Sequence, residues 1–247
     1  MILIIIWEMV YKLGVDILKI WKVYTFPSPV DVAKTLATLI GDNTLAVAIA
    51  VSLRRLVIGY FISLVIGVTM GLLVVKFKYL DENFSPLILG MQTLPSICWV
   101  PFAILWYGLN ENAILFVVII GSTFAIAIAT ESGIKNINPL YLKAARTMGA
   151  KGRNLYTNVI FPAALPSVIS GMKQGWSFAW RALMSAEMMS ATKGLGQVLM
   201  VGRDLADISQ VMAVMIVILV LGLLFDKLVF GKLEKNIRYK CGLDIKV

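Results

Sequence analysis

The sequence predicts an all-α integral membrane protein with about six transmembrane helices. Of its 247 residues, 59% are hydrophobic and only 15% are charged, whereas soluble domains have about 45–50% apolar and about 25% charged residues. Apolar stretches of roughly 20 residues, long enough to cross about 30 Å of hydrocarbon, recur between short polar segments. The net charge of +9 gathers in those short segments. Basic loops beside apolar spans are typical of membrane proteins, so the charge does not indicate nucleic-acid binding.

The composition also excludes several kinds of catalytic and metal site. Histidine is absent, which removes imidazole catalysis and histidine-ligated metals. Cys98 lies in an apolar span and Cys241 in a basic tail, so they predict neither a disulfide nor a thiolate metal site. No G-x-x-x-x-G-K-[ST] phosphate loop occurs. We therefore expect no catalytic residue, no bound metal or cofactor and no ATP hydrolysis by this chain itself.

The first apolar stretch, residues 1–21, differs from the later ones because it carries a charged stripe. The stripe consists of four residues at helical steps, Glu8, Lys12, Asp16 and Lys19. The stretch has neither the basic start nor the cleavage pattern of a signal peptide. Two alternatives remain open: a first span whose stripe faces protein or water, or an amphipathic helix in the membrane interface.

The remaining elements can be placed from apolar length and from helix-starting and helix-breaking residues. Ser28 and Pro29 suit the start of a short external helix that runs to about Ile40. Five further spans are expected at residues 56–75, 84–107, 113–130, 163–189 and 211–230. The span 84–107 contains three prolines, so we expect it to be bent or broken and to lie inside the bundle, where neighbours satisfy the freed carbonyls.

Two G-x-x-x-G patterns permit close crossing of helices. They are formed by Gly67 with Gly71 and by Gly171 with Gly175. Packing within one subunit is the favoured interpretation, and a dimer seam is the alternative.

The stretch between the fourth and fifth spans, residues 131–162, is largely polar in an otherwise apolar chain. Apolar residues recur in it at helical spacing before and after Gly149, which predicts two short amphipathic helices broken at that glycine. Gly149 would provide a turn with positive φ, and Pro162 suits the first turn of the next helix. Its basic and small side chains predict a surface for a protein partner.

The spacing in this stretch resembles the cytoplasmic coupling loop of ABC importer permeases. The shared pattern is Ala-Ala, three residues, Gly, nine residues, then an aliphatic residue, any residue, an apolar residue and Pro. The candidate coupling residues are Lys143, Ala144, Ala145, Arg146, Gly149, Ala150, Lys151, Val159, Phe161 and Pro162. Two of them depart from the family pattern: Lys143 replaces the usual Glu, which reverses a charge, and Phe161 replaces Leu. In that family the loop docks in a groove of a separate ATPase subunit.

Two further stretches are similar to the sulfonate, nitrate and taurine branch of the same permeases. The first is the run from Gln92-Thr93-Leu94-Pro95 through Trp99 to Leu109, and the second comprises Ser170-Gly171-Met172, Ala179-Trp180 through Leu183, Ala186-Glu187 and Gly194-Leu195-Gly196. The resemblance implies a type I ABC importer permease, the inner-membrane component of binding-protein-dependent transport. It implies one transmembrane domain over residues 1–247, with a core at about 50–230 and the coupling loop at 131–162. The function implied is import of a small, anionic organic solute across the cytoplasmic membrane. A vitamin precursor or other small organic molecule is an alternative cargo, and a stand-alone secondary transporter is an alternative class.

The resemblance also implies the partners and the orientation. The partners are two copies of an ATP-binding subunit, which would hold ATP and Mg, an extracytoplasmic substrate-binding protein, and a second permease copy in a homodimer. With both termini in the cytoplasm, the cytoplasmic segments hold 12 Lys and Arg residues and the external segments hold 6. This excess favours that orientation.

The fifth span contains three charged residues that are costly in a bilayer, Lys173, Arg181 and Glu187. Lys173 and Arg181 lie within about 80° of each other around a helix, so we expect Lys173 to border a translocation path for anions. The alternatives are that Lys173 neutralises Glu131 or meets a backbone carbonyl and that Arg181 extends to the outer interface. Glu187 is too far from Arg181 for an ideal helical pair, so we expect it to bond to another helix or to backbone N–H groups. The full set of path candidates is Gln92, Trp99, Lys173, Trp176, Trp180, Arg181 and Glu187.

Overall fold

The computed structural model describes residues 2–18, 20 and 25–240, and every regular element in those ranges is a helix. The side chains of Asp16, Arg238 and Lys240 and the whole of Lys19, Cys241 and Lys246 lie outside the description, so the sequence predictions for them have no structural counterpart. The elements of the first half are α1 (Ile2–Tyr11), η1 (Lys12–Ile17), α2 (Pro29–Gly41), α3 (Thr44–Lys76), α4 (Lys78–Thr93), η2 (Ser96–Trp99), α5 (Val100–Tyr107) and α6 (Glu111–Lys135). Those of the second half are α7 (Pro139–Thr147), α8 (Gly152–Leu155), η3 (Tyr156–Ile160), α9 (Phe161–Met189), α10 (Leu195–Asp204), α11 (Ile208–Phe225), η4 (Asp226–Phe230) and α12 (Gly231–Lys240).

Four helical stretches in the described residues are long and apolar enough to cross a membrane. They cover Thr44–Lys76, Glu111–Lys135, Gly152–Met189 and Ile208–Ile237. A fifth candidate is the pair formed by α4 and the helical stretch Ser96–Tyr107, which meet at an angle of 96°. The expected count of six spans is thus not reached within the described residues, whereas the all-helical membrane class is.

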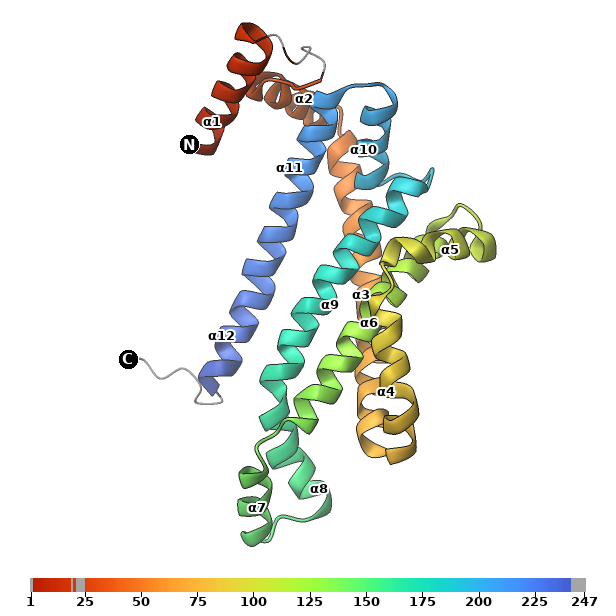
Figure 1. Cartoon of the computed structure of the whole chain (residues 1–247), viewed down its shortest axis with the longest axis vertical. Coiled ribbons are helices and arrows are strands. Elements are labelled where there is room, and N and C mark those ends of the chain that lie inside the picture. Colours follow the sequence, from red (N-terminus) through yellow and green to blue (C-terminus); the bar gives the residue numbers. More distant parts are fainter. Residues whose placement is uncertain (1, 19, 21–24, 241–247) are drawn as a thin grey trace.

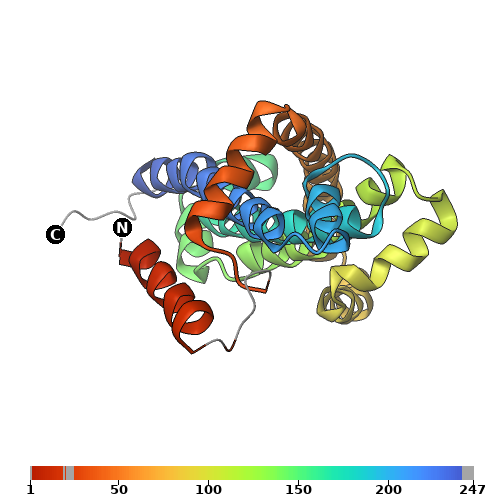
Figure 2. The ribbon, with the colours of Figure 1, turned by 90° about the horizontal axis from the view of Figure 1, so that it is seen from above.

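The long helices run side by side along the long axis of the molecule (Figure 1). α6 packs against both α3 and α9, and α11 extends along the other side of α9. α2 and α10 lie at one end of this bundle and α7 and α8 at the other, while α5 projects sideways (Figures 1 and 2). The bundle therefore has two chemically different ends, and the polar stretch found in the sequence forms one of them.

Glycines bring α6 close to both of its neighbours. A Cβ added to Gly171 of α9 would lie 1.9 Å from the Cβ of Ala129 on α6, and one added to Gly67 of α3 would lie 2.7 Å from the carbonyl oxygen of Thr123. Only glycine fits at such crossings. Both G-x-x-x-G patterns therefore pack helices within this chain.

The N-terminal helix is shorter than a span. α1 and η1 together cover 16 residues, Ile2–Ile17, or about 24 Å at 1.5 Å per residue. An ion pair joins Lys12 and Glu8 at 3.4 Å, and the indole of Trp7 donates a hydrogen bond of 3.2 Å to the carbonyl of Pro27. The bond from Trp7 places α1 beside the start of α2 at one end of the bundle (Figure 1).

The predicted helix breaks are found, but two expectations about the spans change. Ser28 caps α2 as expected, and its hydroxyl accepts a 3.1 Å hydrogen bond from the N–H of Asp31. α3 begins at Thr44, 12 residues before the predicted span. Arg54 and Arg55, which were expected to precede the span, lie within this helix, where acidic partners neutralise them. The broken span was expected inside the bundle, yet most of its large side chains, such as Leu105 and Trp106, are exposed in the single chain.

Candidate functional site

The polar stretch folds into two short helices joined by a tight turn, as its periodicity predicts. Asn138 caps the start of α7, and its side chain accepts a 2.9 Å hydrogen bond from the N–H of Leu140. Gly149 follows α7 with φ +89°, and the next N–H, of Ala150, donates back to the carbonyl of Ala145 at 2.9 Å. This closure needs a left-handed residue after the helix, which glycine adopts without steric cost.

The second short helix continues directly into the fifth span. α8 passes into η3 and η3 into α9 without leaving helical backbone angles, since Ile160 has φ −66° and ψ −52°. Pro162 lies in the first turn of α9, where its missing N–H costs little. The turn between the two helices is therefore connected to a membrane-crossing helix by a continuous helical path.

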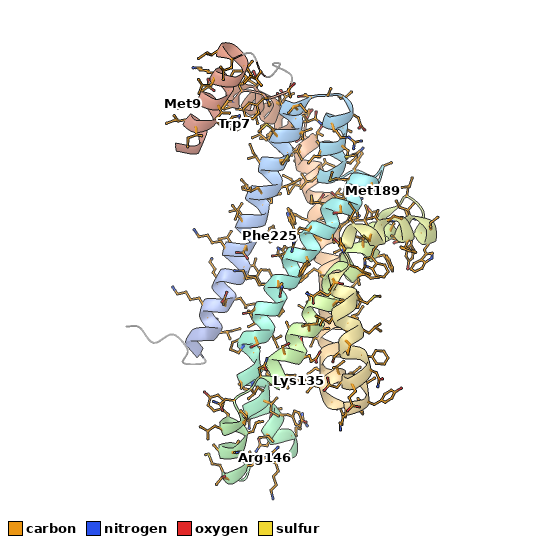
Figure 3. All side chains as sticks on the ribbon, in the orientation of Figure 1. Trp7, Met9, Lys135, Arg146, Met189 and Phe225 are labelled. Carbon is orange, nitrogen blue, oxygen red and sulfur yellow. The ribbon has the colours of Figure 1, made fainter. Side chains whose placement is uncertain are left out.

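This coupling segment, residues 139–162, projects beyond the spans, as the position of Arg146 shows (Figure 3). α7 packs against α8 and η3, and each of the two short helices buries one apolar side chain, Ala145 and Leu155. Met148 is 87% exposed and Phe161 is 65% exposed. The tip of the segment is therefore an exposed apolar side chain with charged side chains around it.

Most of the other predicted coupling residues lie on the surface of the segment. Lys143, Ala144, Arg146, Lys151 and Pro162 are exposed, whereas Ala150 and Val159 are half-buried. In the described residues the segment's basic side chains form no ion pair within the chain. They are thus available to an acidic partner surface.

Lys173 and Arg181 were predicted to share a basic face of α9, but in the structure they have different neighbours. Lys173 forms an ion pair of 3.3 Å with Asp226 of η4. Glu131, the partner in the alternative interpretation of Lys173, instead pairs with Lys135 at 2.8 Å and accepts a 2.9 Å hydrogen bond from Ser85. Lys173 therefore faces η4, on a different side of α9 from the cavity that Arg181 borders, and its role in the path stays a prediction.

The two tryptophans of α9 also face away from Arg181. Trp176 is 7% exposed, and its ring centroid lies 5.1 Å from that of Tyr60 and 5.3 Å from that of Phe225. Trp180 packs toward Gly222 of α11. Trp176 and Arg181 are five residues apart, or about 140° around a helix, so one face cannot hold both.

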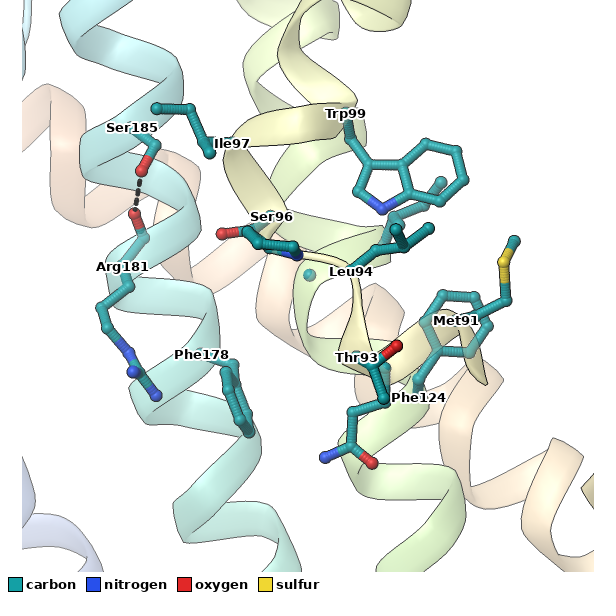
Figure 4. Close-up of a pocket in the computed structure, with 14 residues that line it drawn as sticks. Met91, Thr93, Leu94, Ser96, Ile97, Trp99, Phe124, Phe178, Arg181 and Ser185 are labelled. Carbon is teal, nitrogen blue, oxygen red and sulfur yellow. Dashed lines mark hydrogen bonds between the residues drawn. The ribbon is translucent and has the colours of Figure 1, made fainter. Parts of the chain in front are cut away.

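Arg181 instead borders a cavity at the break between α4 and η2, together with Gln92 and Trp99 (Figure 4). The cavity has a volume of about 380 Å³. Its lining consists of Met91, Gln92, Thr93, Leu94, Pro95, Ser96, Ile97, Trp99, Ile120, Gly121, Phe124, Phe178, Arg181 and Ser185. This lining contains one cation and no carboxylate. Sequence reasoning named three of these residues and missed Phe178 and Ser185, which only the packing of α9 on η2 and α6 brings in.

Arg181 is held by its own helix and not by an acid. Its guanidinium carbon lies 4.6 Å from the ring centroid of Phe178, and Nε donates a 3.2 Å hydrogen bond to the carbonyl of Ser177. No carboxylate in the described part of the chain pairs with it. An arginine within a membrane helix is costly where it faces lipid. Water or an anion in the cavity would reduce that cost.

Glu187 lies outside this cavity and bonds to a neighbouring helix and to a backbone N–H. It is 0% exposed, and its carboxylate accepts hydrogen bonds from Ser52 at 2.7 Å, from Arg55 at 3.0 Å and from the N–H of Gly196 at 3.1 Å. Arg55 also pairs with Glu111 of α6 at 3.0 Å. The network fixes α3, α6, α9 and the start of α10 to one another, so Glu187 does not face a path within this chain.

Comparison with known proteins agrees with this arrangement. The family model described as "binding-protein-dependent transport system inner membrane component" matches residues 63–239. A putative ABC transporter permease of Methanocaldococcus jannaschii is 33% identical over 75% of this chain and 68% of its own length. A putative aliphatic sulfonates transport permease of Bacillus subtilis is 28% identical over 92% of this chain and 81% of its own.

A solved structure shares the fold. A chain from the inward-facing MetNI methionine ABC transporter superposes with a TM-score of 0.64 at 20% identity. The superposition covers 78% of the chain described here and 96% of that chain. The arrangement of long helices with a projecting helical pair is thus found in a known transporter.

Proposed function

The chain belongs to the binding-protein-dependent transport system inner membrane component family, and from this we infer which of its surfaces each partner contacts. It is the multi-pass, membrane-spanning permease subunit of an ATP-driven ABC importer in the inner membrane, and a separate subunit hydrolyses ATP. An ATP-binding subunit and a substrate-binding protein are its partners. We propose that the coupling segment, residues 139–162, docks on the ATP-binding subunit.

The exposed, basic turn of the coupling segment carries this proposal. Met148 gives it an apolar tip, and Lys143, Arg146 and Lys151 surround that tip with positive charge. Such a tip fits a groove with an apolar floor and acidic edges. The groove offered by the ATP-binding subunit would differ from that of permeases with Glu at the position of Lys143, because it must accept a cation there.

Movement of the segment would reach the spans through continuous helix. η3 runs directly into α9, and only Asn136 to Asn138 separate α6 from α7. When the ATP-binding subunits close, displacement of the segment would therefore tilt α6 and α9 and alter the cavity that these helices share with η2. Packed helices have few discrete arrangements, so a small displacement at one end can switch the bundle.

The same assignment gives the orientation and the assembly that we propose. The coupling segment and the end of α12 lie in the cytoplasm, and α2 and α10 face the substrate-binding protein outside. Because α1 lies beside α2 at that outer end (Figure 1), the sequence prediction of a cytoplasmic N-terminus is replaced by a start of α1 on the outer side. Two copies of the chain enclose the path as a homodimer, with two ATP-binding subunits that hold ATP and Mg.

We propose a small organic anion of the sulfonate type as the cargo. The B. subtilis relative is named as an aliphatic sulfonates permease, and the cavity of this chain offers a cation without any carboxylate. A cationic cargo would meet Arg181 unfavourably.

Co-purification tests the assignment. The chain is expressed with candidate ATP-binding subunits and substrate-binding proteins from the same organism, and the purified complex is reconstituted into vesicles. We expect the ATP-binding subunit to remain bound in a ratio of two to two by native mass spectrometry. We also expect the loaded binding protein to raise ATP hydrolysis. An isolated chain that moves solute without an ATP-binding subunit would overturn the assignment.

A further inference from the structure

The cavity at the break between α4 and η2 has the features of a ligand-binding site. The break is imposed by Pro95, after which the chain turns and Ser96 begins η2. Within the described residues, no hydrogen bond is formed by the side chain of Gln92 or by the hydroxyl of Ser96. Polar groups therefore converge on the cavity with unused donors.

The cation of the cavity is oriented and available. The Phe178 ring holds the guanidinium of Arg181 from one side, and Nε is bonded to the same helix, which leaves the terminal nitrogens for a ligand. Two other cations within spans are paired with acids, Lys173 with Asp226 and Arg55 with Glu187. A guanidinium binds carboxylate, phosphate and sulfonate oxygens through two parallel N–H donors.

The rest of the lining fits an apolar substituent. Trp99 and Phe124 supply aromatic surface on the side of the cavity formed by η2 and α6. The volume of about 380 Å³ is within the usual range for small-molecule sites.

We propose that this cavity binds small organic anions of the sulfonate type during import, with the charged head on Arg181 and Gln92 and the short tail against Trp99. The inference rests on the proposed function for its place in transport, but binding itself requires neither ATP nor the binding protein. Arg181, not Lys173, then selects the sign of the cargo.

Protection of an introduced thiol tests binding directly. Ser96→Cys is made in a chain whose native cysteines are removed by Cys98→Ser and Cys241→Ser. The complex with the ATP-binding subunit, in vesicles, is labelled with the neutral reagent N-ethylmaleimide, and labelling is followed by mass spectrometry. We expect ethanesulfonate to slow labelling saturably and ethylammonium to have no effect.

Variants of Arg181 identify the group responsible. Arg181→Met should raise the concentration of ethanesulfonate needed for half-protection by about tenfold or more, because a charge-assisted pair is lost. Arg181→Lys should keep part of the protection. Arg203→Met, at an exposed arginine of α10 whose side chain bonds within the described residues only to its neighbour Asp204, should leave it unchanged.

The results separate this inference from the function assignment. Protection that is absent in the parent, equal with ethylammonium, or unchanged in Arg181→Met overturns the proposed site. Co-purification of the ATP-binding subunit is measured on the same preparations, so its retention would leave the permease assignment standing. If Arg181→Met does not assemble, the comparison of the two ions on the parent still decides.

Discussion

Arg55 of α3 and Glu187 of α9, 132 residues apart in sequence, form an ion pair with Nη1 3.0 Å from Oε1 and with side chains only 3% and 0% exposed. The pair is completed by Ser52, which donates to Glu187 and accepts a 2.9 Å hydrogen bond from the N–H of Leu195. Removing one partner of a buried ion pair is strongly destabilising, because the other charge is left buried without compensation.

We predict that Glu187→Ala destabilises the purified complex strongly. Loss of one member of a buried pair costs about 3–5 kcal/mol, and Glu187→Gln should lower the melting temperature less because its amide can still accept hydrogen bonds. Glu111→Gln is a comparison on the exposed side of the network, where the effect should be about 1 kcal/mol or less. Equal melting temperatures for the parent and Glu187→Ala would show that the network does not hold the helices together.

The turn at Gly149 leads to a second prediction. A Cβ there would meet no atom within 4 Å, so Gly149→Val acts through its φ of +89° and not through crowding. Non-glycine residues in left-handed backbone cost roughly 1–2 kcal/mol, and β-branched residues cost more. We expect the variant to insert in the membrane but to retain less ATP-binding subunit in a pull-down. Asn tolerates positive φ, so Gly149→Asn should retain more than Gly149→Val, and equal retention by both variants and the parent would contradict this role.

Close packing of α9 on α6 gives a third prediction. Gly171→Ala would place a methyl group 1.9 Å from the Cβ of Ala129, and overpacking of this kind costs about 1–3 kcal/mol. Gly90→Ala on α4 meets no atom within 4 Å and should be neutral or slightly stabilising, because alanine favours helix. Thermal unfolding of the two variants in detergent measures the difference. A melting temperature for Gly171→Ala equal to that of Gly90→Ala would show that the crossing is looser than described.

The ion pair between Lys173 and Asp226 gives a fourth prediction. Lys173→Met leaves a carboxylate unpaired at the edge of the bundle and should lower stability, while the double variant with Asp226→Asn should recover most of the loss. Both side chains are more than a third exposed, so we expect a coupling of only about 0.5–1 kcal/mol from the four-member cycle. Anion import by the double variant should remain near the parent level. A loss of import as large as that of Arg181→Met would return Lys173 to the path.

The sequence was sufficient for the features that depend on neighbouring residues. Hydrophobic length predicted the membrane class, Ser28 predicted the start of α2, and Gly149 with its periodic flanks predicted the two short helices of the coupling segment. Each of these follows from backbone geometry within a few residues.

Features that depend on distant residues could not be predicted in the same way. Arg54 and Arg55 were interpreted as preceding a span, because nothing near them in sequence shows that Glu111 and Glu187 neutralise them. The helical wheel placed Lys173 and Arg181 near each other but could not show that α11 covers one side of α9 and the broken span the other. The contribution of Phe178 to the cavity follows from that packing alone.

Site-specific photocrosslinking tests the central claim most directly. A benzoylphenylalanine is placed at Met148, which is 87% exposed at the tip of the coupling segment, and in a second preparation at Leu205, which is 71% exposed after α10 at the other end of the bundle. After irradiation of membranes that contain the whole transporter, we predict a covalent product with the ATP-binding subunit from position 148 and none from position 205. A product from position 205, or none from position 148, would contradict the assignment of the coupling segment.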